Sequence, residues 1–307
     1  MSYLLLLIGF VLLIKGADAF VDSSSYIARK FKIPSIIVGM TIVAMGTSAP
    51  ELSVSITSSL AGMNDMSIAN VVGSNIFNLA AVLGISSFFG KLKISNKEDI
   101  ATMLASALLL IACVLDIGLS CSRLSMIDGA FLLIAFISYI YDMIRKAKHI
   151  ESPEEETKNK SMFKTILIGL LGLAAIVYGG DLVVNSASAI ATQLGMSENL
   201  IGLTVVALGT SLPELVTSVI ATKKGETGIA IGNVIGSNIF NILLILGTAS
   251  LISPMTVSTF ANIDILIMIG FILVFIFLTH KKQEVNKITG ITMLMLYVSY
   301  LIYTIMR

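Results

Sequence analysis

The chain alternates between long apolar runs and short polar connections from end to end. A helix that crosses a bilayer needs about 20 mostly apolar residues. Runs of this kind predict ten membrane-spanning helices, at residues 2–27, 34–61, 67–89, 99–118, 124–144, 163–191, 198–222, 227–252, 258–279 and 286–306. We therefore expect an all-α integral membrane protein in a lipid bilayer.

The composition agrees with this fold class. Of 307 residues, 56% are hydrophobic and only 13% are charged, whereas a soluble domain carries about 25% charged residues. The net charge of +1 indicates no nucleic-acid partner. The two cysteines, Cys113 and Cys121, lack a disulfide or zinc spacing. The chain has no nucleotide-binding motif, so we expect no cofactor and no ATP-driven step.

The first apolar run, "LLLLIGFVLLIKGADAF", resembles a cleavable signal peptide because an A-x-A triplet follows it at Ala17 to Ala19. The preceding residues, Met1 to Tyr3, carry no basic side chain. The run also has a counterpart deep in the chain. We therefore interpret it as a retained first helix.

Basic residues orient the predicted spans, because lysine and arginine gather in cytoplasmic loops. One set of alternate loops holds seventeen of them, and the other set holds only Arg123 and Arg307. Lys15 lies within a span. This bias predicts a cell-membrane protein with both termini outside and the central loop in the cytoplasm.

An internal repeat divides the chain. Residues 39–53 read "GMTIVAMGTSAPELS" and residues 202–216 read "GLTVVALGTSLPELV". Residues 67–78, "SIANVVGSNIFN", match residues 230–241, "AIGNVIGSNIFN", at the same separation of 163 positions. We expect a five-helix repeat at 1–145, a cytoplasmic linker at 146–162 and a second five-helix repeat at 163–307. An odd number of spans inverts the second repeat in the membrane, an arrangement typical of secondary transporters.

In each repeat, a proline is predicted to interrupt the helix of one membrane span. Proline cannot donate a backbone hydrogen bond and clashes with the carbonyl four residues earlier. Pro50 and Pro213 would free the carbonyls of Gly46 and Gly209 near mid-span. A free carbonyl in lipid must find a partner, and a cation can be that partner.

The interrupted spans also carry hydroxyls and carboxylates. These are Thr47, Ser48 and Glu51 in the first repeat, and Thr210, Ser211 and Glu214 in the second. Such oxygens suit Ca²⁺ and Na⁺ rather than soft metals. A glutamate at the bilayer centre costs roughly 3 kcal/mol, so the pair is a functional candidate. One divalent cation, two monovalent cations or two protons would each cancel its charge, which permits exchange of one ion for another.

The third and eighth spans add further candidates. Ser74 and Asn78 are four residues apart and share a helix face, as do Ser237 and Asn241. Gly73 and Gly236 would let another helix approach closely. The other repeated asparagines are expected to bond backbone groups or to cap broken helix ends: Asn70, Asn233, Asn75 and Asn238.

The paired "GTS-x-PE" and "GSNIFN" motifs resemble the two alpha-repeats of the cation/calcium exchanger superfamily, most closely its prokaryotic sodium/calcium exchanger branch. The resemblance spans essentially the whole chain. It implies a non-enzymatic antiporter that exchanges Ca²⁺ for Na⁺. Because each chain already holds both repeats, we expect it to work as a monomer. The resemblance also implies ligand roles: Glu51 and Glu214 with the backbone oxygens of Thr47 and Thr210 for Ca²⁺, Ser48, Ser211, Ser74 and Ser237 with the carbonyls of Ala44 and Ala207 for Na⁺, and Asn78 and Asn241 at the centre.

Other functions stay open at this point. Some relatives, including potassium-dependent exchangers, have aspartate at the position of Asn241, and its absence disfavours K⁺ cotransport. Proton-driven calcium exchangers usually carry a "GN-x-x-E" motif, which neither repeat has. A cation channel could also place carboxylates at a constriction. An intramembrane hydrolase could use two glutamates as acid and base, but it would not require an inverted duplication.

Structural roles are the alternative for every candidate. The glutamates could form a pair satisfied by neighbouring hydroxyls. The threonine and serine hydroxyls could bond carbonyls of their own helix, and the serines and asparagines of the third and eighth spans could join helices. For Asp18 and Asp181, structural pairing or cavity lining is favoured over ion ligation, and Lys15 is a local partner candidate for Asp18.

The resemblance implies alternating access around a fixed site, with the first and sixth spans sliding across the other eight. Gly16 and Gly179, with the serines that follow them, suit a surface that must slip.

Overall fold

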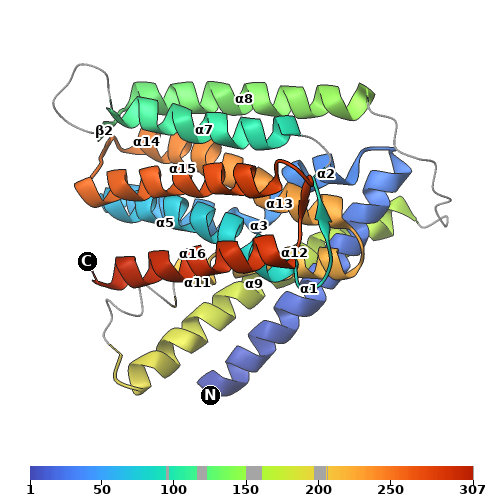
Figure 1. Cartoon of the computed structure of the whole chain (residues 1–307). Coiled ribbons are helices and arrows are strands. Elements are labelled where there is room, and N and C mark those ends of the chain that lie inside the picture. Colours follow the sequence, from blue (N-terminus) through green and yellow to red (C-terminus); the bar gives the residue numbers. More distant parts are fainter. Residues whose placement is uncertain (95–96, 116–122, 150–160, 197–204, 206, 307) are drawn as a thin grey trace.

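The computed structural model describes residues 1–94, 97–115, 123–149, 161–196, 205 and 207–306, and helices make up most of it (Figure 1). The elements of the first half are α1 (Ser2–Lys30), α2 (Ser35–Val38), η1 (Gly39–Val43), α3 (Ala44–Thr47), α4 (Ala49–Leu60), α5 (Asn64–Phe77), η2 (Asn78–Val82), α6 (Leu83–Ser86), α7 (Lys97–Leu115) and α8 (Met126–His149). Those of the second half are α9 (Met162–Gln193), α11 (Ala207–Gly209), α12 (Leu212–Lys223), α13 (Thr227–Phe240), η4 (Asn241–Leu246), α14 (Gly247–Ile252), α15 (Thr259–Thr279) and α16 (Lys287–Met306).

The predicted all-helical membrane fold is confirmed. Eight helices of the described chain are long and apolar enough to cross a membrane, and a ninth span results if the bent pair Ser35–Thr47 and Ala49–Leu60 is counted as one. The predicted span 198–222 begins outside the described residues, and its described remainder forms α11 and α12. α8 continues to His149, past its predicted end at residue 144, because lysine and arginine are good helix formers at a polar helix end.

Both predicted interruptions are present. The helix axis bends by 48° between α3 and α4, and Pro50 occupies the first turn of α4. In the second half α11 ends at Gly209, and Pro213 occupies the first turn of α12. Proline fits the first turn of a helix because the amide there has no intrahelical acceptor. Each proline therefore starts a new helix rather than continuing the old one.

The π-helical segments η1, η2 and η4 lie next to these interruptions or on the facing helices. η2 begins at Asn78 and η4 begins at Asn241, the paired asparagines of the two repeats. In η1 the Tyr139 hydroxyl of α8 donates to the Met40 carbonyl at 2.9 Å. Such wider turns occur often at functional sites, and no feature of the sequence predicts them.

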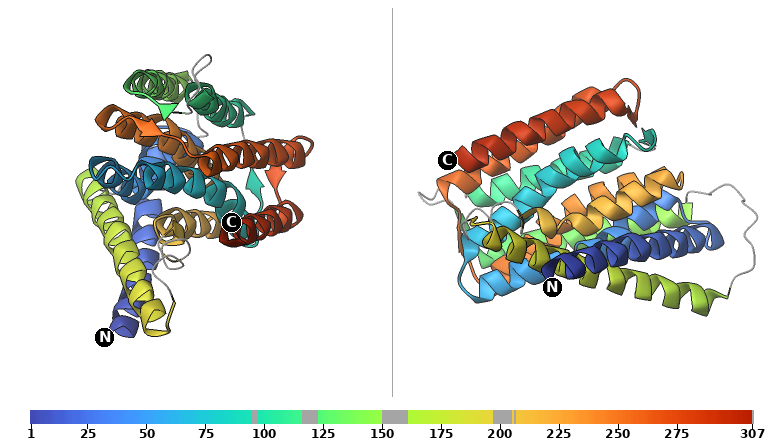
Figure 2. Two further views of the ribbon diagram at one scale, coloured as in Figure 1. Left: turned by 90° about the vertical axis from the view of Figure 1, so that its left-hand side faces the viewer. Right: turned by 90° about the horizontal axis from the view of Figure 1, so that it is seen from below.

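α1 and α9 lie side by side and are inclined to the remaining helices (Figures 1 and 2). Glycines permit their close approach: a Cβ added at Gly9 would lie 2.9 Å from the Gly179 carbonyl oxygen, and one at Gly16 would lie 2.7 Å from that of Gly172. The expectation that Gly16 and Gly179 face the other spans is therefore wrong. These glycines join α1 to α9, so the two helices form one unit.

Two short antiparallel ladders link the halves at opposite ends of the bundle (Figure 1). β1 (Leu92–Lys93) pairs with β4 (Glu284–Val285), and β2 (Arg123–Leu124) pairs with β3 (Met255–Thr256). Each ladder buries an apolar pair, Leu92 opposite Val285 and Leu124 opposite Met255. Strands of two residues have too little periodicity to be predicted.

α13 forms the centre of the bundle. Every residue from Ile229 to Phe240 is buried, including the serine and asparagines of the repeated motif. Its glycines allow α2 and η1 to pack closely: a Cβ at Gly236 would lie 2.6 Å from the Met40 carbonyl oxygen. The close approach predicted for Gly236 is thus confirmed, while the segment equivalent to η1 that would face Gly73 lies almost entirely outside the described residues.

Candidate functional site

The two candidate carboxylates lie in the first turns of the helices that follow the interruptions. Glu51 belongs to α4 and Glu214 to α12, and both side chains are fully buried at 0% exposure. Buried carboxylates occur in proteins only where polar partners or ions accompany them. The surroundings of the pair therefore decide its chemistry.

Serines from the opposite repeat contact each carboxylate. Ser48 Oγ donates to Glu214 Oε1 at 2.9 Å, and Ser211 Oγ donates to Glu51 Oε1 at 3.0 Å. Each serine is the residue at which its own span breaks. The two interruptions thus face one another, and the two carboxylates belong to one cluster.

Serines of the third and eighth spans complete this cluster. Ser74 Oγ lies 3.4 Å from Glu51 Oε1, and Ser237 Oγ lies 3.5 Å from Glu214 Oε1. Ser211 Oγ is also 2.9 Å from Ser74 Oγ. All four serines predicted as ligands are therefore within hydrogen-bonding range of a glutamate.

Several buried oxygens of the site have no hydrogen-bond partner within the described chain. The second carboxylate oxygen, Oε2, of both Glu51 and Glu214 is among them. The same holds for both amide atoms of Asn78, for Oδ1 of Asn241 and for the hydroxyl of Thr210. Buried polar atoms are rarely left without partners. Carboxylate, amide and hydroxyl oxygens form a donor set that fits a hard cation.

Asparagines hold the backbone of both glutamates. Asn70 Nδ2 donates to the Glu51 carbonyl at 3.3 Å and to Ser55 Oγ at 3.0 Å. Asn233 Nδ2 makes the equivalent contacts, with the Glu214 carbonyl at 3.4 Å and with Ser218 Oγ at 3.0 Å. The expectation that these asparagines bond backbone groups is confirmed.

A second asparagine pair joins α5 to α13. Asn75 Nδ2 donates to the Asn238 carbonyl, and Asn238 Nδ2 donates to the Asn75 carbonyl, both at 3.2 Å. Asn241 Nδ2 donates to Asn75 Oδ1 at 3.0 Å. This contact turns the unpartnered oxygen of Asn241 away from Asn75, whereas Asn78 has no such restraint in the described chain.

The remaining candidates are placed less decisively. The Thr47 hydroxyl donates to Asn233 Oδ1 of α13 at 3.0 Å and to the Val43 carbonyl at 3.2 Å, so it links its own helix to α13. The Ala44 carbonyl accepts the Ser48 amide at 3.0 Å. Ala207 begins α11. The ligand roles of the backbone oxygens at positions 44, 47, 207 and 210 remain predictions.

A family model, several relatives and solved structures match this chain. The family model "Sodium/calcium exchanger protein" matches residues 1–145 and 164–306. The chain belongs to this family. Its members are antiporters rather than enzymes, and the present family member is a multi-pass membrane protein.

Individual relatives cover nearly the whole chain. CaxA of Alkalimonas amylolytica is 36% identical, over 96% of this chain and 95% of its own. The sodium/calcium exchanger MaX1 of Methanosarcina acetivorans is 34% identical, over 98% and 97%. A solved structure of the sodium–calcium exchanger NCX_Mj, soaked with Na⁺ and Ca²⁺, is similar with a TM-score of 0.83 at 33% identity, covering 97% of this chain and 96% of that one.

The site of this family member is covered unequally at its two ends. α1 packs along α12, whereas α9 has at most isolated contacts with α4, its counterpart, within the described residues. Val216 and Ile220 of α12 are half-buried, while the equivalent residues of α4, Ser53 and Thr57, are exposed. One end of the site is therefore closed by α1, and the other end is not closed by α9.

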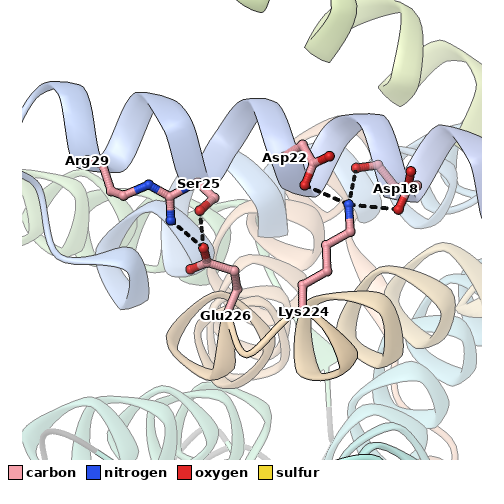
Figure 3. A network of polar contacts seen from close by, with 6 residues as sticks. All are labelled: Asp18, Asp22, Ser25, Arg29, Lys224 and Glu226. Carbon is pink, nitrogen blue, oxygen red and sulfur yellow. Dashed lines mark hydrogen bonds and ion pairs between the residues drawn. The ribbon is translucent and has the colours of Figure 1, made fainter. Parts of the chain in front are cut away.

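Charged residues lie at the end of the site that α1 closes (Figure 3). In the described chain, Asp18 does not form its ion pair with the nearby Lys15. It forms an ion pair of 2.7 Å with Lys224, which also lies 2.6 Å from Asp22. The structural pairing favoured for Asp18 is confirmed, with a partner that sequence proximity did not indicate. Asp181 forms no ion pair within the described chain.

Proposed function

We propose that this antiporter exchanges Ca²⁺ for Na⁺, and that both ions use the site between the two interrupted spans. One observation carries the proposal: each of two fully buried glutamates accepts hydrogen bonds at one carboxylate oxygen and has no partner for the other in the described chain. Two oxygens without partners, one from each half, are what a shared cation would contact.

Electrostatics supports competition between the ions. A buried pair of carboxylates carries a charge of −2, which is costly in a membrane unless it is neutralised. One Ca²⁺ or two Na⁺ would neutralise it equally. Occupancy by one kind of ion then excludes the other, which is the requirement for coupled exchange.

The surrounding residues divide into two groups in this proposal. Glu51 and Glu214 contact Ca²⁺ directly, assisted by the backbone oxygens of Thr47 and Thr210, with Asn78 and Asn241 at the centre. Four serines and the carbonyls of Ala44 and Ala207 form flanking Na⁺ sites, the serines being Ser48, Ser211, Ser74 and Ser237. The hydrogen bonds of the serines to the glutamates couple the flanking sites to the central one.

The distribution of basic residues supports an orientation with both termini outside the cell. In that orientation the end of the site that α1 closes faces the cytoplasm, and the end that α9 leaves uncovered faces outward. The structure then corresponds to an outward-open state of an alternating-access cycle. α1 and α9, joined through their glycines, move together against the remaining helices to open the other side.

Uptake of ⁴⁵Ca²⁺ into proteoliposomes tests this function. We expect uptake when the vesicles contain Na⁺ and the outer medium does not, and no uptake when the Na⁺ gradient is abolished. Uptake that follows an imposed H⁺ gradient instead, or that requires K⁺, would contradict Na⁺ coupling.

Amide substitutions test the site. Glu51→Gln and Glu214→Gln should each lower Ca²⁺ affinity at least about a hundredfold, because loss of one partner of a buried charge cluster costs about 3–5 kcal/mol. Glu98→Gln, at a carboxylate that is 73% exposed, is the control and should bind Ca²⁺ normally. Near-normal Ca²⁺ binding by either buried variant would remove the central assignment.

A further inference from the structure

The turn between α12 and α13 presents two charged residues to α1 (Figure 3). Lys224 Nζ contacts Asp18 Oδ1 at 2.7 Å and Asp22 Oδ1 at 2.6 Å. Glu226 Oε1 accepts from Arg29 Nη1 at 2.6 Å and from the Ser25 hydroxyl. The cluster therefore has two arms, Lys224 with its aspartates and Glu226 with Arg29 and Ser25. The arms bind α1 at two places along its C-terminal part.

The backbone of this turn explains why both side chains face the same helix. Gly225 lies between them with φ +78°, a left-handed conformation that favours glycine. Its amide donates to the Thr222 carbonyl at 3.0 Å, and the Glu226 amide donates to the Ala221 carbonyl at 2.9 Å. These two bonds form a Schellman ending of α12.

The first repeat has the same turn with different side chains. Gly62 has φ +73°, its amide donates to the Ser59 carbonyl at 3.1 Å, and the Met63 amide donates to the Ser58 carbonyl at 2.8 Å. Ala61 stands at the position of Lys224, and Met63 stands at that of Glu226. The turn that would have to grip α9 therefore carries no charge at either position.

The helices differ in the same way. Asn185 and Thr192 of α9 replace Asp22 and Arg29 of α1. Ser188, the counterpart of Ser25, has a buried hydroxyl without a partner in the described chain. Only Asp181 preserves a charge, that of Asp18. The cluster is thus specific to one end of a molecule whose backbone is repeated at the other.

We propose that Lys224 and Glu226 form a latch that holds α1 on the α12–α13 turn and favours the state in which the cytoplasmic end of the site is closed. This inference rests on the proposed function for the direction of the two ends. The latch must release each time α1 moves, so it sets how often the inward-open state is populated. Without an equivalent on α9, the two states of the cycle are not equal in energy.

The strength of the latch suits a carrier that must cycle. Partly exposed ion pairs are individually weak, so either arm alone should change the ratio of the two states by about twofold to fivefold. Loss of both arms should change it by about tenfold. A stronger clamp would trap the protein in one state.

A cysteine reporter measures the ratio of the two states without any ion. Ile220→Cys, at a half-buried position of α12, is introduced in a full-length Cys113→Ala, Cys121→Ala background. A membrane-impermeant maleimide is then applied from the cytoplasmic side of oriented vesicles. We expect the combined change Lys224→Met with Glu226→Gln to raise the labelling rate about tenfold. The reporter Thr57→Cys, at the equivalent position of α4, should be labelled more slowly from outside in the same variant.

Two controls separate the latch from general loosening of the fold. Arg29→Glu and Glu226→Arg should each raise the labelling rate. The two changes together exchange the charges and should restore the slow rate. Lys281→Met, at an exposed lysine of the α15–α16 turn, should leave the rate unchanged. An unchanged Ile220→Cys rate in the double variant, or a failure of the charge exchange to restore it, would overturn the latch.

The outcome is independent of the proposed ions. If the unmodified chain exchanges Ca²⁺ for Na⁺ but the reporter does not respond, the latch alone is wrong. If the reporter responds as expected but no Ca²⁺ is exchanged for Na⁺, the latch stands as a conformational device and the proposed exchange of Ca²⁺ for Na⁺ is wrong.

Discussion

Two helix pairs, α1 with α12 and α9 with α4, have related sequences because of the internal repeat. Their packing is nevertheless different. α1 covers α12, and Ser24, Ser25 and Ala28 of α1 are almost fully buried. At the equivalent positions of α9, Ala187 and Ser188 are only half-buried, although Ala191 is buried. The difference lies at the ends of the site, not at its centre.

At the centre the two halves agree closely. The serine-to-glutamate contacts are 2.9 and 3.0 Å, and the asparagine-to-carbonyl contacts that support the glutamates are 3.3 and 3.4 Å. A symmetric centre between asymmetric ends is what alternating access requires, because the ions must stay bound while the path to them changes. Under the proposed function, the comparison therefore separates residues that would bind ions from residues that would control access to them.

The largest expected effect comes from making the closed end permanent. Asp22→Cys and Lys224→Cys, bridged with a short, cleavable bifunctional thiol reagent, would tie α1 to the α12–α13 turn. Exchange needs both states of the cycle, so Na⁺-driven ⁴⁵Ca²⁺ uptake should fall to background. Ca²⁺ binding from the outside should persist because the centre is untouched.

Each single cysteine variant treated with the same reagent is the control for this bridge, and reductive cleavage of the bridge should return transport. Normal uptake by the bridged protein would show that α1 does not have to leave α12 during the cycle.

An intermediate effect is expected from building the missing latch at the other end. Ala61→Lys and Met63→Glu, combined with Asn185→Asp and Thr192→Arg, would give α9 and the α4–α5 turn the charges of the first end on an identical backbone turn. The Thr57→Cys reporter should then be labelled several-fold more slowly from outside, and Ile220→Cys faster from the cytoplasmic side. The same four positions changed to residues of one charge sign should not produce the shift.

The candidate residues at the centre of the site can be recognised from the sequence because their chemistry follows from residue type. Pro50 and Pro213 dictate the interruptions through backbone geometry, and a glutamate in an apolar span requires a partner. Ser74 and Ser237 are candidates because of their spacing on helices, and Ser48 and Ser211 because they lie within the interruptions. These features depend on local covalent structure and on the cost of burying charge, which need no knowledge of the tertiary packing.

The features proposed to control access depend on contacts distant in sequence. Lys224 and Asp18 are 206 positions apart, and Lys15 was the nearer candidate along the chain. The π-helical turns at Asn78 and Asn241 arise from packing and have no pattern of their own. A glycine face indicates close packing without identifying the partner helix, so Gly16 and Gly179 lie at a different interface from the one expected from the sequence.

The smallest expected effect concerns the response of the latch to pH. Burial lowers the pKa of Lys224, but the hydrogen bonds and charges of Asp18 and Asp22 raise it more, so that the pKa lies above its ordinary value. A raised pKa means that the folded state holds the proton more tightly. The stabilisation that protonated Lys224 gives to the folded state is therefore fully present below the ordinary lysine pKa. It is lost as the pH rises through the higher pKa of the folded state. The melting temperature of the unmodified chain should exceed that of Lys224→Met by about 1–3 °C, and this difference should stay constant from about pH 6 to pH 9 and shrink in stronger alkali. A difference that already declines between pH 6 and pH 8 would mean that a group other than this lysine holds α1 on the closed side.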